Sequence, residues 1–406
     1  MTQATIPIKP RRVTGQPAAA AEASGGAMNF VAVRMLTGDR AKYLGLIFAI
    51  AFSTFLIAQQ VSIFAGLLDR IRSQILDVWD ADIWVMDPAT QYVDEIYALR
   101  DDDLYRVRGV PGVRWAEPLF KGQPVARARN GRFRAVILMG LDDATLAGAP
   151  QKMILGSVQS LRDPDAVIID LAGYHFLFPG RAPALGDVLE MNDHRARIVG
   201  ISDASPPFTS FPVMFSRYSL AVNYIGRQRT QMSFLLAKPQ PGVSVAEATR
   251  RIHDATGLRA VSKDEFGWMT IGYYMAHTGI PVNFGLTVAI GLIVGTVVAG
   301  QTFYIFTIEN LKQFGALKAI GTTNLRIVGM ILLQALLVGA IGYSIGMGMT
   351  ATFFSITVRQ EATRGIVLLW QTMAATAGVV LFIVAVASLM SIRKVLKLEP
   401  AMVFRG

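Results

Sequence analysis

Four long stretches of this 406-residue chain contain no Asp, Glu, Lys or Arg. A charged side chain at the middle of a bilayer costs about 2.5–3.5 kcal/mol, and a membrane-spanning helix needs about 20 residues. Four stretches of that length among 68 charged residues therefore predict four transmembrane helices. The stretches are residues 43–68, 266–308, 327–358 and 365–392. Because Gly279, Ile280 and Pro281 interrupt the second stretch, its helix is placed at 282–308.

The basic residues are unevenly distributed along the chain. Residues 1–42, 309–326 and 393–406 together hold 13 Lys and Arg but four Asp and Glu, a net charge of +9. The long segment 69–265 holds 24 residues of each sign. Because cytoplasmic segments next to spans carry an excess of Lys and Arg, both termini are expected in the cytoplasm and the long segment in the periplasm. Membrane topology thereby explains the net charge of +10, and no nucleic-acid partner is expected.

The expected fold class is a membrane α-helical protein with four transmembrane helices and an α+β periplasmic domain inserted between helices 1 and 2. The composition agrees with this class, since the chain is 52% hydrophobic and only 17% charged, against about 25% charged in soluble domains. Runs rich in Val and Ile, and a β-α-β pattern over residues 232–261, predict the α+β domain. The helical period of the first span continues past the apolar stretch to Val78, which predicts a stalk.

The predicted organisation follows from these boundaries. Its parts are a cytoplasmic tail with an amphipathic helix (1–42), the first span (43–68) with its stalk to about 78, the periplasmic domain (79–262), a second stalk (263–281), the second span (282–308), a cytoplasmic loop (309–326), the third span (327–353), a short periplasmic loop (354–365), the fourth span (366–392) and a cytoplasmic tail (393–406). Within the periplasmic domain, two lobes are expected. One is formed by residues of about 80–150 and 228–262, and the other by about 151–227.

The cytoplasmic loop contains a segment with a helical pattern. On a helical wheel, one side carries large apolar residues, and the other side carries small residues and one lysine. The apolar side is Leu311, Phe314, Leu317 and Ile320, and the other side is Lys312, Gly315, Ala316 and Ala319. Gly321 suits the end of such a helix. The helix could lie along the membrane surface while another protein approaches it, although an ordinary connecting loop fits the spacing equally well.

The sequence lacks the common motifs of catalysis. It contains no G-x-x-x-x-G-K-[ST], no H-E-x-x-H and no G-x-S-x-G, and it has no cysteine. Its four histidines are scattered, and Asp101, Asp102 and Asp103 stand at an expected helix start, where carboxylates are favoured. We therefore expect a non-catalytic chain with no metal site and no cofactor of its own.

Pairs of glycines four positions apart occur in the predicted spans. Gly291 with Gly295, and Gly342 with Gly346, would let helix backbones approach closely. The partner of each pair is either another helix of the same chain or a second copy, and the spacing leaves both open.

Several segments together resemble the permeases of MacB/FtsX-type (type VII) ABC transporters. Residues 311–321, L-K-Q-F-G-A-L-K-A-I-G, look like that family's cytoplasmic motif, basic-x-E-I-G-x-L-[RK]-A-[IL]-G. Residues 398–405, L-E-P-A-M-V-F-R, are similar to its closing D-P-A-x-x-[FL]-R. The segments that look most like the DevC branch are D-I-W-V-M-D-P at 82–88, G-Q-T-F-Y at 300–304 and E-N-L-K-Q-F-G at 309–315.

The resemblance implies that residues 311–320 form a coupling helix in a groove of a separate ABC ATPase subunit, which would bind ATP and Mg²⁺. The implied coupling residues are Leu311, Lys312, Phe314, Gly315, Leu317, Lys318, Ile320 and Gly321. Phe314 and Leu317 are the expected apolar contacts. Further implied partners are a second permease chain in a homodimer, a periplasmic membrane-fusion protein and membrane lipid. The implied function is export of a lipid-like or amphipathic substrate from the bacterial inner membrane.

Two residues depart from the family pattern, and two other functions stay open. Gln313 and Gln334 stand where the family commonly has Glu, so any ATPase contact made by those carboxylates must differ here. One alternative is an FtsX-like signal transducer that activates a periplasmic partner without transport. The other is a membrane-anchored sensor that has no ATPase.

The charge distribution predicts opposite sides of the membrane for the cytoplasmic loop and the large domain. Because the chain has no cysteine, single cysteines at Thr323 and Asn130 would each report one side. In intact spheroplasts, a membrane-impermeant maleimide should label Asn130→Cys and should label Thr323→Cys only after lysis. Equal labelling of both before lysis would contradict the orientation.

Overall fold

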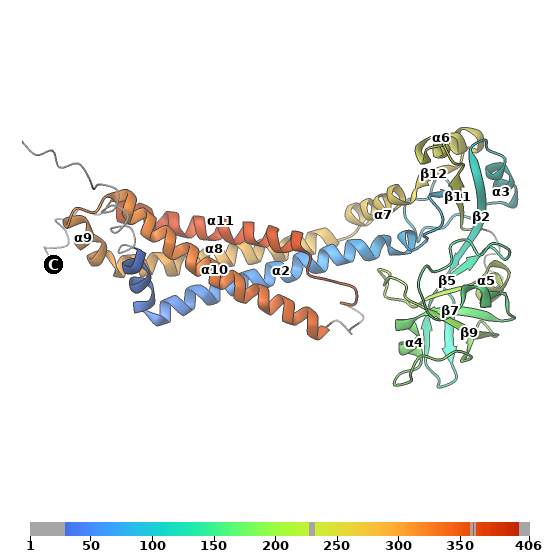
Figure 1. Ribbon diagram of the computed structural model, residues 1–406, viewed down its shortest axis with the longest axis horizontal. Coiled ribbons are helices and arrows are strands. Elements are labelled where there is room, and N and C mark those ends of the chain that lie inside the picture. Colours follow the sequence, from blue (N-terminus) through green and yellow to red (C-terminus); the bar gives the residue numbers. More distant parts are fainter. Residues whose placement is uncertain (1–28, 227–231, 358–359, 361–362, 398–406) are drawn as a thin grey trace, which may run out of the picture. The chain divides into compact units, whose positions relative to one another are not determined.

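The computed structural model describes residues 29–226, 232–357, 360 and 363–397. Contacts between its residues divide the chain into two compact units. Figure 1 shows the chain coloured by residue number, with the helices and strands labelled. The helical unit contains the described residues within 1–61, 285–353 and 368–406. The α+β unit contains those within 62–284 and 354–367.

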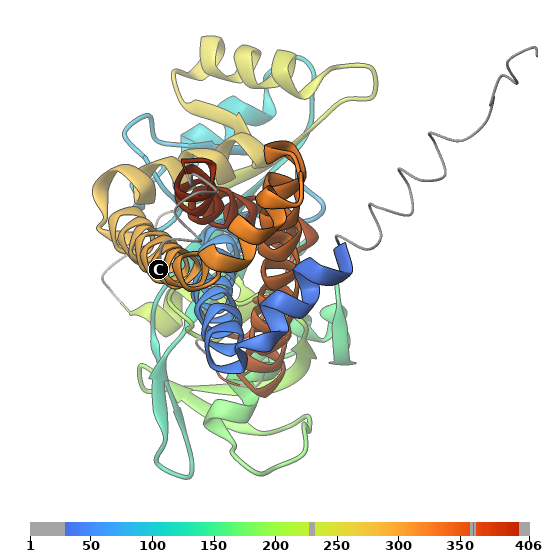
Figure 2. The ribbon, with the colours of Figure 1, turned by 90° about the vertical axis from the view of Figure 1, so that its left-hand side faces the viewer.

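The helical unit is a bundle of long apolar helices, seen end-on in Figure 2. Its helices are α2 (Arg40–Leu76, with residues 40–61 in this unit), α8 (Ile280–Glu309), α9 (Leu311–Ala319), α10 (Asn324–Thr357) and α11 (Trp370–Leu396). Within the described residues, α2, α8, α10 and α11 are long and apolar enough to cross a membrane. The first three include the predicted spans. The fourth begins at Trp370 instead of residue 366, because residues 363–367 pack in the α+β unit.

Glycines bring α10 close to α2. A Cβ atom added at Gly342 would lie 2.8 Å from the Cβ of Ile50. One added at Gly346 would lie 2.4 Å from the backbone oxygen of Ala51. Both distances are shorter than a carbon atom tolerates, so only glycine permits this approach of the two backbones.

Glycines also bring α8 close to α2. A Cβ at Gly291 would lie 3.1 Å from Cγ1 of Ile57, and a Cβ at Gly295 would lie 2.5 Å from Oγ of Ser53. Both glycine pairs therefore pack against α2 of the same chain. Of the two partners that the spacing left open, the structure provides the intramolecular one.

The α+β unit is built on one mixed sheet. The strands are β1 (Ile83–Met86), β2 (Val113–Gly122), β3 (Val125–Ala128), β4 (Phe133–Ala135), β5 (Ile137–Leu141), β6 (Met153–Gly156), β7 (Ala166–Asp170), β8 (Val188–Met191), β9 (His194–Ser202), β10 (Val213–Arg217), β11 (Phe234–Pro239) and β12 (Arg259–Ser262). Their order is β12-β1-β11-β2-β5-β10-β7-β9-β8-β3-β4, and β6 pairs with β9. The β10–β5 and β7–β9 pairs are parallel, and the other pairs are antiparallel.

Helices cover parts of this sheet. They are α3 (Asp101–Arg108), α4 (Leu171–Leu177), α5 (Tyr218–Ile225), α6 (Val245–Thr256) and α7 (Lys263–His277), with a 3₁₀ helix η1 (Val158–Arg162). As predicted, β11, α6 and β12 follow one another as a β-α-β unit, and the three aspartates open α3. The proposed division into lobes differs from the structure, because β3 and β4 pair with β8 from the middle segment through an antiparallel ladder.

The helix α7 contacts both the sheet and residues 62–76 of α2, which belong to the same unit. The ring of Phe266 on α7 lies 5.5 Å from that of Trp84 on β1, in a buried aromatic cluster. Further along α7, the guanidinium of Arg72 on α2 lies 5.5 Å from the ring of Trp268, a cation–π distance. The two helices expected as stalks therefore contact each other within the α+β unit.

The glycine contacts give a test with a matched control on one helix. Gly346→Leu should destabilise the purified chain by about 1–3 kcal/mol, because its side chain would overlap α2. Gly348→Leu should have little effect, because a Cβ at Gly348 meets no atom within 4 Å. Thermal unfolding in detergent measures both. Equal loss of stability in the two variants would contradict the assigned packing.

Candidate functional site

The helix α9 joins α8 to α10 through two short turns. Asn310 ends the preceding turn, and its side-chain amide donates to the carbonyl of Phe306 at 2.8 Å. After α9, Gly321 adopts a φ of +99°, which favours glycine, and the amide of Thr322 donates to the carbonyl of Leu317 at 3.0 Å. The first bond satisfies a carbonyl near the end of α8, and the second satisfies one near the end of α9. The segment is therefore a separate helix, one of the two possibilities that the spacing left open.

Three of the four residues predicted on the apolar side of α9 face its own bundle, whereas the fourth, Ile320, is exposed after the helix end. Phe314 is 0% exposed and belongs to the same core cluster as Phe306 of α8 and Ile327 of α10. Gly315 is also buried, while Leu311 and Leu317 are half-buried. Phe314 therefore offers no free surface here to an ATPase, which differs from its expected role as an apolar contact. The physical reason is that the bundle's own core covers the large apolar side chain.

The polar end of Lys318 is also used within the chain. Its Nζ donates to the carbonyl of Val395 at 3.0 Å, near the end of α11, where the last carbonyls of a helix have no partner of their own. With Phe314, this bond connects α9 to three of the long helices. Lys318 is thus a structural contact of the bundle.

The remaining surface of α9, together with Ile320 directly after it, is open to solvent. We define the α9 outer face as Lys312, Gln313, Ala316, Ala319 and Ile320, all of which are exposed. Ile320 is 84% exposed, and Leu325, at the start of α10, is 81% exposed. Gly321 is exposed between them. Of the predicted coupling residues, Lys312, Ile320 and Gly321 thus lie on free surface, and Gln313, Ala316 and Leu325 were missed. Ala316 could have been found on the side of the helical wheel opposite Phe314, whereas Leu325 belongs to the start of α10 and no pattern on α9 indicates it.

A helical segment at residues 29–38 lies beside the start of α9. Its Ala32 is buried, and the carbonyl of Ala32 accepts a hydrogen bond of 2.8 Å from Nε2 of Gln334 on α10. A groove of about 510 Å³ runs between this segment and α9. The residues that line it are Phe30, Val31, Arg34, Met35, Gly38, Asp39, Glu309, Asn310 and Gln313. The groove extends the exposed surface of α9 to the predicted amphipathic helix.

The two glutamines that replace the family's usual glutamates have different surroundings. Gln334 is 0% exposed, and its amide donates inside the bundle, whereas Gln313 lies on the α9 outer face. Gln334 therefore has no free surface to offer a partner. Gln313 is the position at which a change of charge would alter the exposed surface.

Within the described residues, no group of three or more His, Asp or Glu side chains is placed to hold a metal ion. The α9 outer face is an exposed surface of apolar, small and polar residues with one lysine.

Replacing each glutamine by glutamate should distinguish the buried, structural Gln334 from the exposed Gln313. Gln334→Glu should lower the stability of the chain by about 1–3 kcal/mol at neutral pH, because it removes the donor to Ala32 and buries a carboxylate. Gln313→Glu should leave stability within about 0.5 kcal/mol, because that side chain is exposed. Thermal unfolding of the two purified variants is the measurement. A stable Gln334→Glu protein would show that the bond to Ala32 is dispensable.

Comparison with known proteins places these features in a family. Residues 44–255 match the model described as "MacB-like periplasmic core domain", and residues 285–400 match "FtsX-like permease C-terminal". The macrolide export ATP-binding/permease proteins MacB of Escherichia coli (strain K12) and Shigella flexneri are each 23% identical over 325 residues. These alignments include 75% of this chain and 48% of the relatives, so the chain spans about half the length of the curated relatives it matches.

Solved structures include similar domains. The periplasmic region of MacB from Actinobacillus actinomycetemcomitans is 16% identical with a TM-score of 0.36, covering 50% of this chain and 96% of that one. The extracellular domain of the transporter YknZ from Gram-positive bacteria is 14% identical with a TM-score of 0.33, covering 45% and 98% respectively. The first family model alone matches more than half of the 406 residues, and the second matches the remaining apolar helices. This chain therefore belongs to the MacB/FtsX-type permeases of ABC transporters.

Proposed function

We propose that this chain is the non-catalytic permease subunit of an ABC exporter and that a separate ABC ATPase docks on the α9 outer face. The observation that carries this proposal is the exposure of Ile320 and Leu325, at 84% and 81%, in a polar segment between two spans. Exposed apolar side chains gathered beside basic residues are typical of a surface that a partner covers. ATP and Mg²⁺ would bind to that partner, because this sequence has no phosphate-binding loop.

The burial of Phe314 suggests how movement would enter the bundle. Phe314 packs with α8 and α10, and Lys318 bonds to α11. An ATPase that displaces α9 would therefore also displace the ends of these helices, since packed side chains transmit small movements with little compression. In this proposal, the exposed side of α9 binds the ATPase and the buried side transfers its movement.

The remaining parts of the proposal concern location and assembly. The basic segments support an inner-membrane protein with both termini and α9 in the cytoplasm, and with the α+β unit between helices 1 and 2 in the periplasm. We further propose a homodimer of permeases with two ATPases, a periplasmic membrane-fusion protein as adaptor, and a lipid-like or amphipathic substrate. The segments at 82–88, 300–304 and 309–315 support placement in the DevC branch.

Substitutions on the α9 outer face should weaken ATPase binding without unfolding the bundle. Ala316→Trp and Ile320→Asp should each reduce the affinity by about ten-fold or more, corresponding to ~1.4 kcal/mol, because one adds bulk and the other a buried charge to the interface. Ala316 is a better site than Gly315, which is buried and would report disrupted packing. Binding of the purified ABC ATPase to the full chain in nanodiscs measures the effect.

Controls keep this experiment specific. Ala316→Ser retains a small side chain and should bind the ATPase normally. Arg393→Glu changes an exposed charge outside the α9 outer face and should also leave ATPase binding unchanged. Normal ATPase binding by both Ala316→Trp and Ile320→Asp would contradict the docking site.

ATP-dependent removal of a fluorescent phospholipid from proteoliposomes would support export. ATP-dependent activation of a periplasmic hydrolase without lipid removal would favour the FtsX-like transducer.

A further inference from the structure

The loop between α10 and α11 belongs to the α+β unit. The described residues within 354–367 group with this unit by their contacts, although the helices on either side belong mostly to the helical unit. A Cβ at Gly66 of α2 would lie 2.7 Å from Cγ1 of Ile366, and a Cβ at Gly365 would lie 3.0 Å from Cγ of Pro206. The loop is thus in close contact with α2 on one side and with the segment after β9 on the other.

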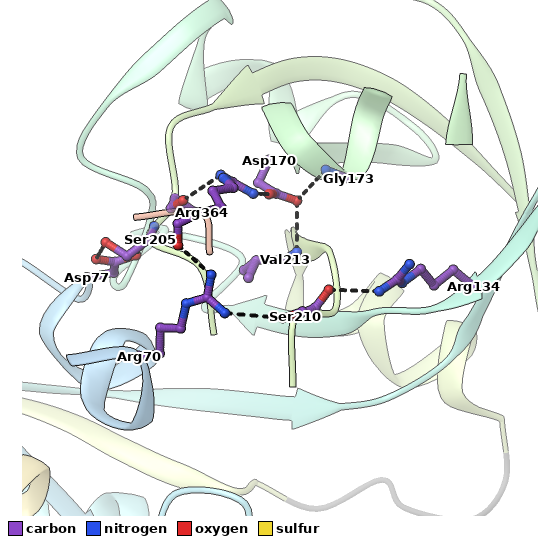
Figure 3. A network of polar contacts seen from close by, with 10 residues as sticks. Arg70, Asp77, Arg134, Asp170, Gly173, Ser205, Ser210, Val213 and Arg364 are labelled. Carbon is purple, nitrogen blue, oxygen red and sulfur yellow. Dashed lines mark hydrogen bonds and ion pairs between the residues drawn. The ribbon is translucent and has the colours of Figure 1, made fainter. Parts of the chain in front are cut away.

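Asp170 forms the centre of a polar network in this unit (Figure 3). It stands at the end of β7 and caps α4, and its Oδ1 accepts from the amides of Gly173 at 3.2 Å and Val213 at 3.0 Å. The carboxyl is buried, and this burial raises its pKa, whereas Arg364 acts in the opposite direction. A buried carboxylate needs a positive partner, and the partner here comes from the α10–α11 loop.

Arg364 is held by three separate segments of the chain. Its Nη1 donates to Oδ2 of Asp170 at 3.2 Å, and its Nη2 donates to the carbonyl of Ala204 at 3.3 Å. Its own carbonyl accepts a hydrogen bond from the guanidinium of Arg70 on α2. We define the Arg364 contact as these three interactions. The sequence did not indicate them, because Asp170 and Arg364 are 194 residues apart.

Asp77, directly after the last residue of α2, joins the same region. Oδ1 and Oδ2 of Asp77 accept from Oγ and the amide of Ser205, each at 2.8 Å, beside the carbonyl that Arg364 uses. Figure 3 shows Asp77, Ser205, Arg364 and Asp170 in succession. One short polar chain therefore links α2, the α10–α11 loop and the capped start of α4.

We propose that the Arg364 contact is a mechanical connection for transport, through which the α10–α11 pair moves the α+β unit in addition to α2 and α7. This inference rests on the proposed function, in which α9 displaces the helix ends. Arg364 and Asp170 are positioning residues in this role and touch no substrate. The planar guanidinium of arginine suits this contact better than the ammonium of lysine, because it can bind the carboxylate of Asp170 and the carbonyl of Ala204 at the same time.

The first test removes the contact while preserving the fold. Arg364→Met leaves a buried carboxylate without its partner, so the double variant Asp170→Asn with Arg364→Met is the second arm. Asparagine retains an oxygen for Gly173 and Val213, and no charge is left uncompensated. The full chain with its ABC ATPase in nanodiscs is compared with and without ATP and vanadate. The readout is amide hydrogen exchange in residues 166–217.

We expect the wild-type complex to show an ATP-dependent change in this exchange and the double variant to lose it, with ATP hydrolysis and the ATP-free exchange pattern retained. Arg364→Lys should lose part of the change, because it cannot hold both acceptors as a fork does. An unchanged response in the double variant would overturn the connection, as would a wild-type complex with no response.

A disulfide supplies the rescue that a purely structural role would not predict. The Cβ at Gly66 would lie 3.1 Å from the Cβ of Ile366, near the separation of about 3.5–4.5 Å found in disulfides, and the chain has no other cysteine. Gly66→Cys with Ile366→Cys should restore the ATP response in the double variant, and a reductant should abolish it again. Restored stability without a restored response would overturn the proposal.

The Ala316→Trp variant distinguishes failure of the Arg364 contact from failure of the proposed permease function. If Ala316→Trp abolishes the ATP response while the double variant keeps it, the Arg364 contact is not used and the permease function stands. If Ala316→Trp binds ATPase and responds normally, the proposed coupling through α9 fails.

Discussion

The packing of glycines against α2 is the interaction on which the helical unit depends. In lipid, apolar side chains gain little by moving from one hydrocarbon environment to another, so helices associate through close contact of their surfaces. Gly342 and Gly346 provide that contact from α10, and Gly291 and Gly295 provide it from α8. The helix α2 receives both pairs along residues 50–57, which makes it the central element of the bundle.

This packing explains why α9 has two different sides. The ends of α8 and α10 are held close enough for Phe314 to enter the core between them, and Lys318 then reaches the end of α11. The side chains left outside are short, basic or exposed apolar residues, and these form the α9 outer face. The family match includes this surface, which lies on a short helix between two long apolar helices, and the proposed ATPase contact uses it.

The features that could be predicted from the sequence are those that depend on local residue patterns and on charge. Four charge-free stretches predicted the long helices, and the β11-α6-β12 unit was readable from its alternation and turn residues. The burial of Phe314 was not predicted, because a helical wheel shows which residues share a side but not what covers that side. Pairing of β3 with β8 and of Arg364 with Asp170 also escaped prediction. These contacts join residues far apart in the chain, and one sequence contains no information on which distant partner a strand or a buried charge will choose.

Because α2 is one continuous helix, it moves along and about its axis as a single unit. Residues 40–61 lie among the glycines, and residues 62–76 lie in the α+β unit, within one uninterrupted helix. An α-helix that slides by one residue in a screw motion advances about 1.5 Å and turns by about 100°. Such a step would carry Arg70 and Asp77 away from their acceptors, since hydrogen bonds tolerate only a few tenths of an ångström. The hydrogen bonds of these two side chains therefore oppose rotation of α2 about its own axis, while they permit the helix to tilt.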